Sequence, residues 1–496
     1  MNKEDSLDRI VVGLLGAGPI GSNLACNFAD HGIGVALYDK NEETLRRVMS
    51  TVDGLKGRVS AYSSVKAVID MLTTPRICFL CVPSGEAVDE AIDDLYQSGF
   101  GPHDIIVDCG NNDHKDSLRR IKEWEGRISY MLCPLSGGVK GARFGPSLMP
   151  SGLPKVVEQV MPILQRIAAK ANPLTGDSCK EAQPDQPTMD GEPCVAWIGP
   201  DASGNFVKTT HNGIEYLIMQ AIGEVVWLYV KGLEFDLDKV IDELEKVLKK
   251  PPLSSTFLLE ATIQVLRKRD PRNPEQFLVW EIQDAAHEKG TGAIAVRDGL
   301  ELRAVIPGIA EANFCRTLSS LTQERQKAAG LYQSFEGRFV SPYLLYRMLP
   351  LALQSAFIMA YAQGFAMMQI ASRHYGWNLD LAKIARIWRN GCVIRSNMLQ
   401  LIADAYERKP TLLNLMLDKD FQRMLDASAP ALGQVLYMAL DMYVPVPALT
   451  STYNYFLSYT KTELIWAKVI QGLRDLFGAH GFYLKEDPYQ IVHVDW

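Results

Sequence analysis

The chain lacks the features that mark several classes of protein. It has no long basic run and a net charge of −7, so nucleic acid and anionic membranes are not expected partners. Its N-terminal stretch, MNKEDSLDRI, is charged and has no apolar core of the kind found in signal peptides. Its nine cysteines are odd in number and scattered, which indicates a reducing compartment and no disulfide framework. We therefore expect a cytoplasmic protein.

Neither a membrane span nor a metal site is expected. The window from Leu351 to Ala371 is uncharged and long enough to cross a bilayer. Its three glutamines and many small residues favour a buried helix of a helical domain instead. Cys78 and Cys81 form a CxxC, but they lie in the apolar run ICFLCV, which predicts a buried strand. We expect these two thiols to be core residues rather than metal ligands.

The N-terminal part contains a glycine-rich turn in a specific context. The residues IVVGLL predict a strand, GAGPIG follows it, a helix comes next, and a second strand ends at Asp39. This context predicts a dinucleotide site in which the helix N-terminus binds the phosphates. The alternative is a similar turn that binds no nucleotide. The candidate residues of the turn are Gly16, Gly18, Pro19, Ile20 and Gly21.

Asp39 and Lys40 bear on the choice of cofactor. An acid at the end of the second strand accepts hydrogen bonds from the ribose hydroxyls of NAD and repels the extra phosphate of NADP. Lys40 acts in the other direction, because it can neutralise such a phosphate. The sequence thus favours NAD and leaves NADP open.

Further strands are predicted to start at Ile77, Asp104 and Ile128, with helical segments between most of them. This alternation predicts a parallel sheet, whose ligands bind at the carboxyl ends of its strands. The loops at those ends contain Val82, Asn111 and the turn Ser136, Gly137 and Gly138. A Ser-Gly-Gly turn exposes backbone N–H groups that can hold an anion, although it is also compatible with an ordinary turn.

The chain length and the change of pattern along it predict more than one domain. Strand signals nearly vanish beyond Gly204, and the segment 174–193 predicts an exposed loop. We therefore predict an α/β Rossmann-type domain (1–201), a large all-helical domain (202–462) and a C-terminal tail (463–496). The tail is too polar for a core helix and is expected to fray or to contact a second subunit.

One predicted helix, which begins near Phe206, has polar groups on a single face. They lie at positions i, i+3, i+4 and i+7 and are Lys208, His211, Asn212 and Glu215. Taken singly, such a lysine or glutamate is usually a solvated surface charge. Together they suit oxidation of a 3-hydroxy acid, which needs a base for the hydroxyl proton, and its decarboxylation, which needs an acid for the enediol. The face therefore predicts a substrate cleft.

Several long motifs resemble the 6-phosphogluconate dehydrogenase family, the decarboxylating enzymes of the pentose phosphate pathway. They occur in the family's order over essentially the whole chain: the Gly-rich turn, SGG with GARFGPSLMPSG, VKTTHNGIEY, KGTG, CRTLSSLTQER, WRNGCVIRS and RDLFGAH. The resemblance implies that Lys208 is the general base and Glu215 the general acid, and that Asn212 and His211 hold the sugar acid. It also implies a homodimer in which the tail of one subunit completes the site of the other.

The resemblance further implies a set of substrate-binding residues. These are Asn111, Ser136, Gly137, Gly138, Tyr216, Lys289, Thr291, Arg316, Arg474 and His480. The cofactor would contact the Gly-rich turn together with Asp39, Lys40, Val82 and Asn111. Arg316 is also compatible with a structural ion pair, and Arg474 and His480 with ordinary surface positions.

Departures from the family pattern indicate a divergent member. Most members have Asn-Arg-Thr after the second strand, where this chain has Asp39-Lys40-Asn41, and Val139 and Lys140 replace two acids. We expect oxidative decarboxylation of 6-phosphogluconate or a closely related phosphorylated 3-hydroxy sugar acid with NAD or NADP. Two alternatives stay open: a 3-hydroxy acid dehydrogenase of a specialised pathway acting on another phosphorylated substrate, and a non-catalytic sensor of a nucleotide or sugar phosphate.

Overall fold

The N-terminal part of the computed structural model is built on a six-stranded parallel sheet. The structure describes residues 10–51, 58–288, 290–332 and 341–496. The strand order is β3-β2-β1-β4-β5-β6. The strands are β1 (Val11–Leu15), β2 (Gly34–Tyr38), β3 (Val59–Ala61), β4 (Ile77–Leu80), β5 (Ile105–Asp108) and β6 (Ser129–Leu132). The order reverses between β1 and β4, so a crevice opens there at the carboxyl edge of the sheet. The predicted parallel sheet is confirmed.

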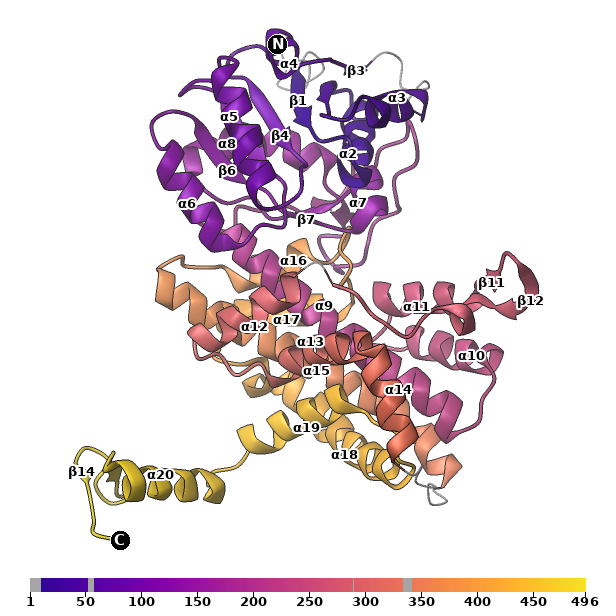
Figure 1. The fold of residues 1–496 in the computed structure, drawn as a ribbon, viewed down its shortest axis with the longest axis vertical. Helices are drawn as coiled ribbons and strands as arrows, with labels where there is room; N and C mark the ends of the chain where they lie inside the picture. The colour runs from indigo at the N-terminus through magenta and orange to yellow at the C-terminus, as the bar shows by residue number, and fades with distance from the viewer. Residues whose placement is uncertain (1–9, 52–57, 289, 333–340) are drawn as a thin grey trace.

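Helices cover both faces of this sheet (Figure 1). They are α2 (Pro19–Asp30), α3 (Glu42–Thr51), α4 (Val65–Asp70), α5 (Glu86–Gln97), α6 (His114–Trp124), α7 (Gly138–Phe144) and α8 (Pro154–Ile167). Short strands complete this part: β7 (Leu135–Ser136), β8 (Ser147–Leu148), β9 (Lys170–Ala171) and β10 (Glu192–Pro193). Every residue of β4 and β5 is buried, which explains why both are apolar except at Asp108, the last residue of β5.

The remainder of the chain is largely helical. Its long helices are α9 (Ser203–Trp227), α10 (Leu237–Leu248), α11 (Phe257–Arg267), α12 (Thr291–Glu301), α13 (Pro307–Ser320), α14 (Thr322–Leu331), α15 (Pro342–Tyr375), α17 (Met398–Arg408), α18 (Lys419–Asp441) and α19 (Pro447–Tyr459). Shorter pieces are η1 (Leu228–Gly232), η2 (Leu278–Glu281), α16 (Leu381–Ile387) and η3 (Leu415–Leu417). α15 packs against α9 and α18 in one extended apolar core.

Two helical segments of the described chain are long and apolar enough to cross a membrane, Ser203–Gly232 and Pro342–Tyr375. Their most apolar windows are 61% and 83% buried inside the protein. The second contains the window from Leu351, which was predicted to be a buried core helix. Its burial against α9 and α18 agrees with that interpretation.

The helical part differs in one respect from the prediction that it is all-helical. An antiparallel hairpin, β11 (Arg269–Asp270) with β12 (Asn273–Phe277), extends from it. The hairpin is almost entirely exposed, so it has no alternation of apolar and polar residues to reveal it. Asp270 stabilises the turn by accepting hydrogen bonds from the backbone N–H and the guanidinium of Arg272.

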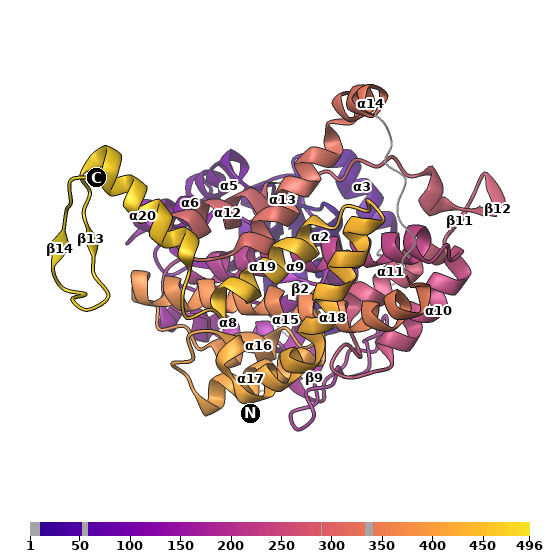
Figure 2. The ribbon, with the colours of Figure 1, turned by 90° about the horizontal axis from the view of Figure 1, so that it is seen from below.

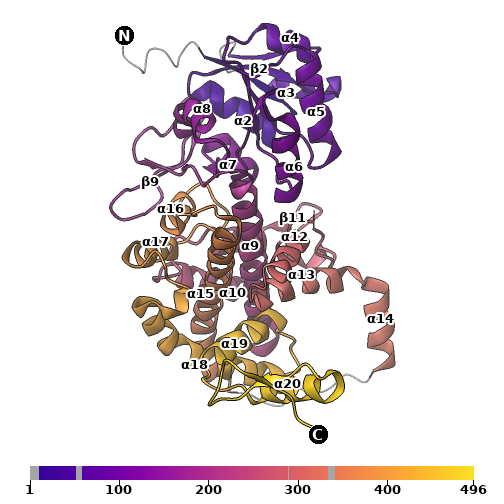
Figure 3. The same ribbon diagram turned by 90° about the vertical axis from the view of Figure 1, so that its left-hand side faces the viewer.

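The C-terminal tail projects from the helical body (Figures 1 and 2). It consists of α20 (Ile465–Gly478) and a hairpin of β13 (Phe482–Tyr483) with β14 (Ile491–Val492). In Figure 3 it lies at the end of the molecule opposite the sheet. The apolar side chains of α20 are 48–73% exposed: Ile465, Trp466, Val469, Ile470, Leu473, Leu476 and Phe477. Apart from the hairpin of the tail itself, the described residues leave this apolar surface of α20 uncovered, as is typical of an interaction site.

Candidate active site

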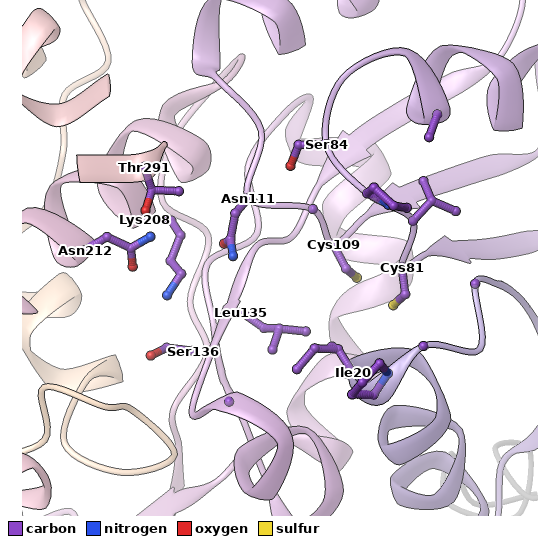
Figure 4. Close-up of a pocket in the computed structure, with 18 of the residues that line it drawn as sticks. Ile20, Cys81, Ser84, Cys109, Asn111, Leu135, Ser136, Lys208, Asn212 and Thr291 are labelled. Carbon is purple, nitrogen blue, oxygen red and sulfur yellow. The ribbon is translucent and has the colours of Figure 1, made fainter. Parts of the chain in front are cut away.

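A cleft of about 1170 Å³ joins the carboxyl edge of the sheet to the helical part. The predicted residues that line it are Gly16, Gly18, Pro19, Ile20, Asp39, Lys40, Val82, Asn111, Ser136, Gly137, Gly138, Lys208, Asn212, Glu215, Tyr216, Thr291 and Arg316. Figure 4 shows Lys208, Asn212, Thr291 and Ser136 on one side and Ile20 on the other, with Asn111 between them. The fold therefore gathers segments from both parts of the chain into one cleft.

Four predicted residues within the described chain do not line this cleft. Gly21 lies beneath the turn, and His211 is fully buried behind the cleft wall. Lys289 lies outside the described residues. Arg474 and His480 belong to the tail, where the guanidinium of Arg474 donates to Oε1 of Gln471 at 3.0 Å. The tail residues thus play no part in the cleft of their own chain.

The Gly-rich turn is shaped by packing at two positions and open at the third. Gly16 has φ +100°, and a Cβ there would lie 2.5 Å from the carbonyl oxygen of Cys81. A Cβ at Gly21 would lie 1.9 Å from the carbonyl oxygen of Gly16. A Cβ at Gly18 would meet nothing within 4 Å, although Gly18 lines the cleft. The open space above Gly18 fits the close approach of a ligand phosphate.

The start of α2 also fits a dinucleotide. Pro19 occupies its first turn, and no side chain caps the N-terminus, so its N–H groups remain available to an anion. Asp39 lies beside it at the end of β2. Oδ2 of Asp39 accepts from the backbone N–H of Ala17 at 2.7 Å, and Oδ1 accepts from that of Asn41 at 2.9 Å. These bonds fix the carboxylate, whose remaining lone pairs can accept from ribose hydroxyls.

Lys40 has a partner that the sequence did not predict. Its Nζ donates to Oε2 of Glu90, on α5, at 2.6 Å. This hydrogen bond raises the pKa of Lys40. Glu90 and Asp94 both line the cleft next to Asp39. The nucleotide end of the cleft is therefore more acidic than Asp39 alone indicates.

A buried carboxylate holds the loop that presents Asn111. Oδ1 of Asp108 accepts from the N–H of Gly110 at 2.8 Å, and Oδ2 accepts from Nδ2 of Asn112 at 2.8 Å. The carbonyl oxygen of Asn112 in turn accepts from Nδ2 of Asn205 at 3.1 Å. Because Asn205 belongs to α9, the loop is attached directly to the helix that bears Lys208.

The Ser-Gly-Gly turn packs against the segment WRNGCVIRS, for which no individual role was predicted. Gly137 has φ +105°, and a Cβ there would lie 2.5 Å from the carbonyl oxygen of Gly391. The backbone N–H of Val393 donates to Oγ of Ser136 at 3.2 Å. Val393 also lines the cleft. Residues far apart in sequence thus fix the position of Ser136.

Lys208 and Glu215 have pKa values that are shifted toward each other. Lys208 is 6% exposed, and burial lowers its pKa from the usual value of a lysine. Burial raises the pKa of Glu215, an effect that the charges of Lys208 and Arg316 oppose. Both shifts favour the neutral forms, in which a lysine accepts a proton and a glutamic acid donates one. The cleft therefore contains a base and an acid two helical turns apart.

His211 supports this pair from behind the cleft wall. Its Nδ1 lies 3.0 Å from Oδ1 of Asn212, and its Nε2 lies 2.9 Å from Oγ of Ser136 and 3.0 Å from Sγ of Cys392. Burial lowers the pKa of His211 well below its usual value, so the ring is neutral. The contacts assign the proton to Nδ1, which donates to Asn212, while Nε2 accepts. His211 therefore orients cleft residues and does not line the cleft.

The far end of the cleft can hold an anion. The guanidinium carbon of Arg316 lies 3.4 Å from the centre of the Tyr216 ring. Thr291 begins α12, whose N-cap, Gly290, provides no side-chain hydrogen bond. A stacked arginine next to an uncapped helix N-terminus suits a phosphate group. Among the described residues, no cluster of three or more His, Cys, Asp or Glu side chains is placed to hold a metal ion.

Comparison with known proteins matches nearly the whole chain. Residues 11–180 match the model of the NAD binding domain of 6-phosphogluconate dehydrogenase, and residues 204–496 match the model of its C-terminal domain. The chain is 37% identical to the NADP(+)-dependent decarboxylating 6-phosphogluconate dehydrogenase of Bacillus subtilis, with 98% of each chain covered. It is 37% identical to the decarboxylating enzyme of Cunninghamella elegans, covering 98% of this chain and 96% of that one.

A solved structure agrees with these matches. The Plasmodium falciparum 6-phosphogluconate dehydrogenase, studied with NADP+ and with 6-phosphogluconate, superposes with a TM-score of 0.89 at 31% identity. The match covers 98% of this chain and 100% of that one. With both domains matched in order and relatives more than 30% identical over nearly the whole chain, this chain belongs to the 6-phosphogluconate dehydrogenase family.

Proposed function

We propose that the chain catalyses oxidative decarboxylation of 6-phosphogluconate, or of a close relative, to ribulose 5-phosphate and carbon dioxide, with NAD as the preferred acceptor. The observation that carries this proposal is the position of Lys208 and Glu215. They lie in the same cleft as the dinucleotide turn, with pKa values shifted in opposite directions. A protein that only senses a sugar phosphate has no use for such a pair.

The anionic end of the substrate would bind where Arg316, Tyr216 and Thr291 meet. Asn111, Ser136 and Asn212 would hold the hydroxyl and carboxylate groups. The bound nicotinamide supplies the hydride acceptor. These contacts orient the substrate so that its 3-hydroxyl faces Lys208, which is the arrangement the reaction needs.

Proton transfer follows from the state of the two titrating groups. Neutral Lys208 takes the proton of the 3-hydroxyl as the hydride leaves carbon 3. As the carboxylate departs as carbon dioxide, the resulting lysine ammonium donates its proton to the new 3-carbonyl oxygen, which gives the enediol and leaves Lys208 neutral again. Glu215 then protonates carbon 2 of the enediol while Lys208 recovers a proton from its hydroxyl. His211 and Cys392 keep Ser136 and Asn212 in place during these steps.

The preference for NAD rests on Asp39. Its carboxylate is fixed beside the Gly-rich turn, where it can accept hydrogen bonds from the adenosine ribose. The extra phosphate of NADP would approach the same carboxylate and be repelled. Lys40, the neighbouring cation, is already paired with Glu90.

We also propose that the enzyme is a homodimer in which the tails are exchanged. The exposed apolar side chains of α20 are left uncovered by the described residues, and a second subunit would cover them. Arg474 and His480 would then reach the substrate phosphate of the partner subunit. This would supply the cationic groups that Arg316 alone does not provide.

The proposal is tested by mixing the purified protein with 6-phosphogluconate and either NAD or NADP. Reduced nicotinamide and released carbon dioxide are followed together. Equal amounts of both products, formed faster with NAD, would support the proposal. Reduced nicotinamide without carbon dioxide would indicate a 3-hydroxy acid dehydrogenase, and cofactor binding without turnover would indicate another substrate or a sensor.

A further inference from the structure

The ion pair between Lys40 and Glu90 lies where the two cofactors differ. Lys40 directly follows Asp39 just after the end of β2. Glu90 lies on α5, and both Lys40 and Glu90 line the cleft. Nζ of Lys40 and Oε2 of Glu90 are 2.6 Å apart. The hydrogen bond raises the pKa of Lys40, so the lysine is charged at any physiological pH and that charge faces Glu90.

Acidic groups outnumber basic ones around this pair. The described carboxylates that line the nucleotide end are Asp39, Glu90 and Asp94, and the described lysine there is Lys40. The other described lysine and arginine that line the cleft, Lys208 and Arg316, belong to α9 and α13 at its far end. A dianionic group placed beside Lys40 would therefore meet three carboxylates and one ammonium.

The two cofactors place different demands on Lys40. The ribose hydroxyls of NAD need an acceptor, which Asp39 provides, and they need nothing from Lys40. The 2′-phosphate of NADP needs a cation, so Lys40 would have to leave Glu90 to bind it. Glu90 would then remain unpaired next to the phosphate. Binding of NADP thus has two costs, the broken ion pair and the new repulsion, that binding of NAD avoids.

We infer that Glu90 is a cofactor-specificity residue, which rejects the 2′-phosphate of NADP by engaging Lys40 and by opposing the phosphate with its own charge. This inference rests on the proposed preference for NAD. Specificity of this kind has two sources: a group that disfavours binding of NADP, and the contacts that favour binding of NAD. Glu90 therefore complements Asp39, which makes the contact with NAD.

The test measures cofactor binding by calorimetry in the absence of any sugar acid, so it does not depend on turnover. Dissociation constants for NAD and NADP are compared in the wild type, Glu90→Gln, Lys40→Gln and the double variant. In Glu90→Gln we expect the Kd of NADP to fall by about fivefold or more, because Lys40 becomes free to bind the phosphate. The Kd of NAD should stay within about twofold, because its ribose contact is to Asp39.

The double variant separates the two causes. When Lys40 is already glutamine, Glu90→Gln should improve NADP binding less than it does in the wild type, since only repulsion is relieved. Glu86→Gln is the matched control, because Glu86 is exposed on the same helix and does not line the cleft. It removes the same charge and should leave both dissociation constants within about twofold.

Three results from the variants would overturn the inference: an unchanged Kd for NADP in Glu90→Gln, an equal gain for NAD, or an equal gain in Glu86→Gln. Failure of the proposed reaction would look different. A protein that gains NADP affinity through Glu90→Gln but does not oxidise 6-phosphogluconate would keep this inference and lose the proposed substrate. A wild type that already binds NADP more tightly than NAD would refute both the preference and the role of Glu90.

Discussion

The Nζ of Lys208 lies 3.5 Å from Nδ1 of His211, the same ring nitrogen that donates to Oδ1 of Asn212. Because that nitrogen bears the hydrogen, it gives the lysine no acceptor. Burial lowers the pKa of this lysine and favours the neutral amine, an effect that the charge of Glu215 opposes. The arrangement explains how a lysine, usually a cation, can be available as a base.

Replacing Lys208 with methionine keeps the apolar stem and removes the base. We expect turnover of 6-phosphogluconate to fall by at least roughly 10³-fold, while NAD binding, measured by calorimetry, stays unchanged. Lys140→Met is the matched control, since Lys140 is an exposed lysine paired with Glu181. Substantial activity in Lys208→Met would remove Lys208 from the mechanism.

The pKa shifts predict a bell-shaped pH profile of kcat/KM. The active form has neutral Lys208 and protonated Glu215, so the rate rises as the lysine loses its proton and falls as the glutamic acid loses its own. The pKa of Lys208 is lowered and that of Glu215 is raised, which increases the fraction of active form between the two limbs. In Glu215→Gln we expect a lower rate and no decline at high pH. A decline that persists in this variant would assign it to another group.

Two glycines of the same turn should respond differently to alanine. Gly18 has φ −62° and open space where its Cβ would lie, so Gly18→Ala should leave the melting temperature nearly unchanged and weaken NAD binding by obstructing the phosphate. A Cβ at Gly21 would collide with the carbonyl oxygen of Gly16, so Gly21→Ala should destabilise the fold by about 1–3 kcal/mol. Thermal unfolding and calorimetry together check both. Equal effects on stability would contradict the packing described for the turn.

Tail exchange can be tested by mixing two inactive variants, Lys208→Met and Arg474→Ala. If the tail acts on the partner, a mixed dimer has one site with an intact lysine and an intact arginine. After random subunit exchange the mixture should regain about one quarter of wild-type activity. If the tail acts on its own chain, every site keeps a defect and mixing restores nothing.

Local sequence was sufficient to predict the dinucleotide turn, the strands β4, β5 and β6, and the polar face of α9. Each of these depends on residues close together in the chain, where periodicity and turn chemistry are informative. β3 was not predicted because it has only three residues and one of them is exposed. Its strand character comes from pairing with β2, which the sequence does not reveal.

The residues that the sequence missed act across long separations. Glu90 pairs with a lysine 50 positions away, and Cys392 contacts a histidine 181 positions away. Neither belongs to a recognisable local pattern, so only the fold brings them to the site. For His211 the local pattern was informative but incomplete. Helical spacing put it on the same face as Lys208 and Asn212, but it did not show that Ser136 and Cys392 cover its ring.

The position of α9 has a mechanical consequence. This single helix bears Lys208 and Glu215, the proposed base and acid, and its first turn is bonded through Asn205 to the loop that presents Asn111. The separation between Lys208 and Glu215 is set by helical geometry alone. Rocking of the sheet against the helical body would change access to the nicotinamide without stretching the distance between base and acid. Binding of the coenzyme would then leave the spacing of these two groups unchanged.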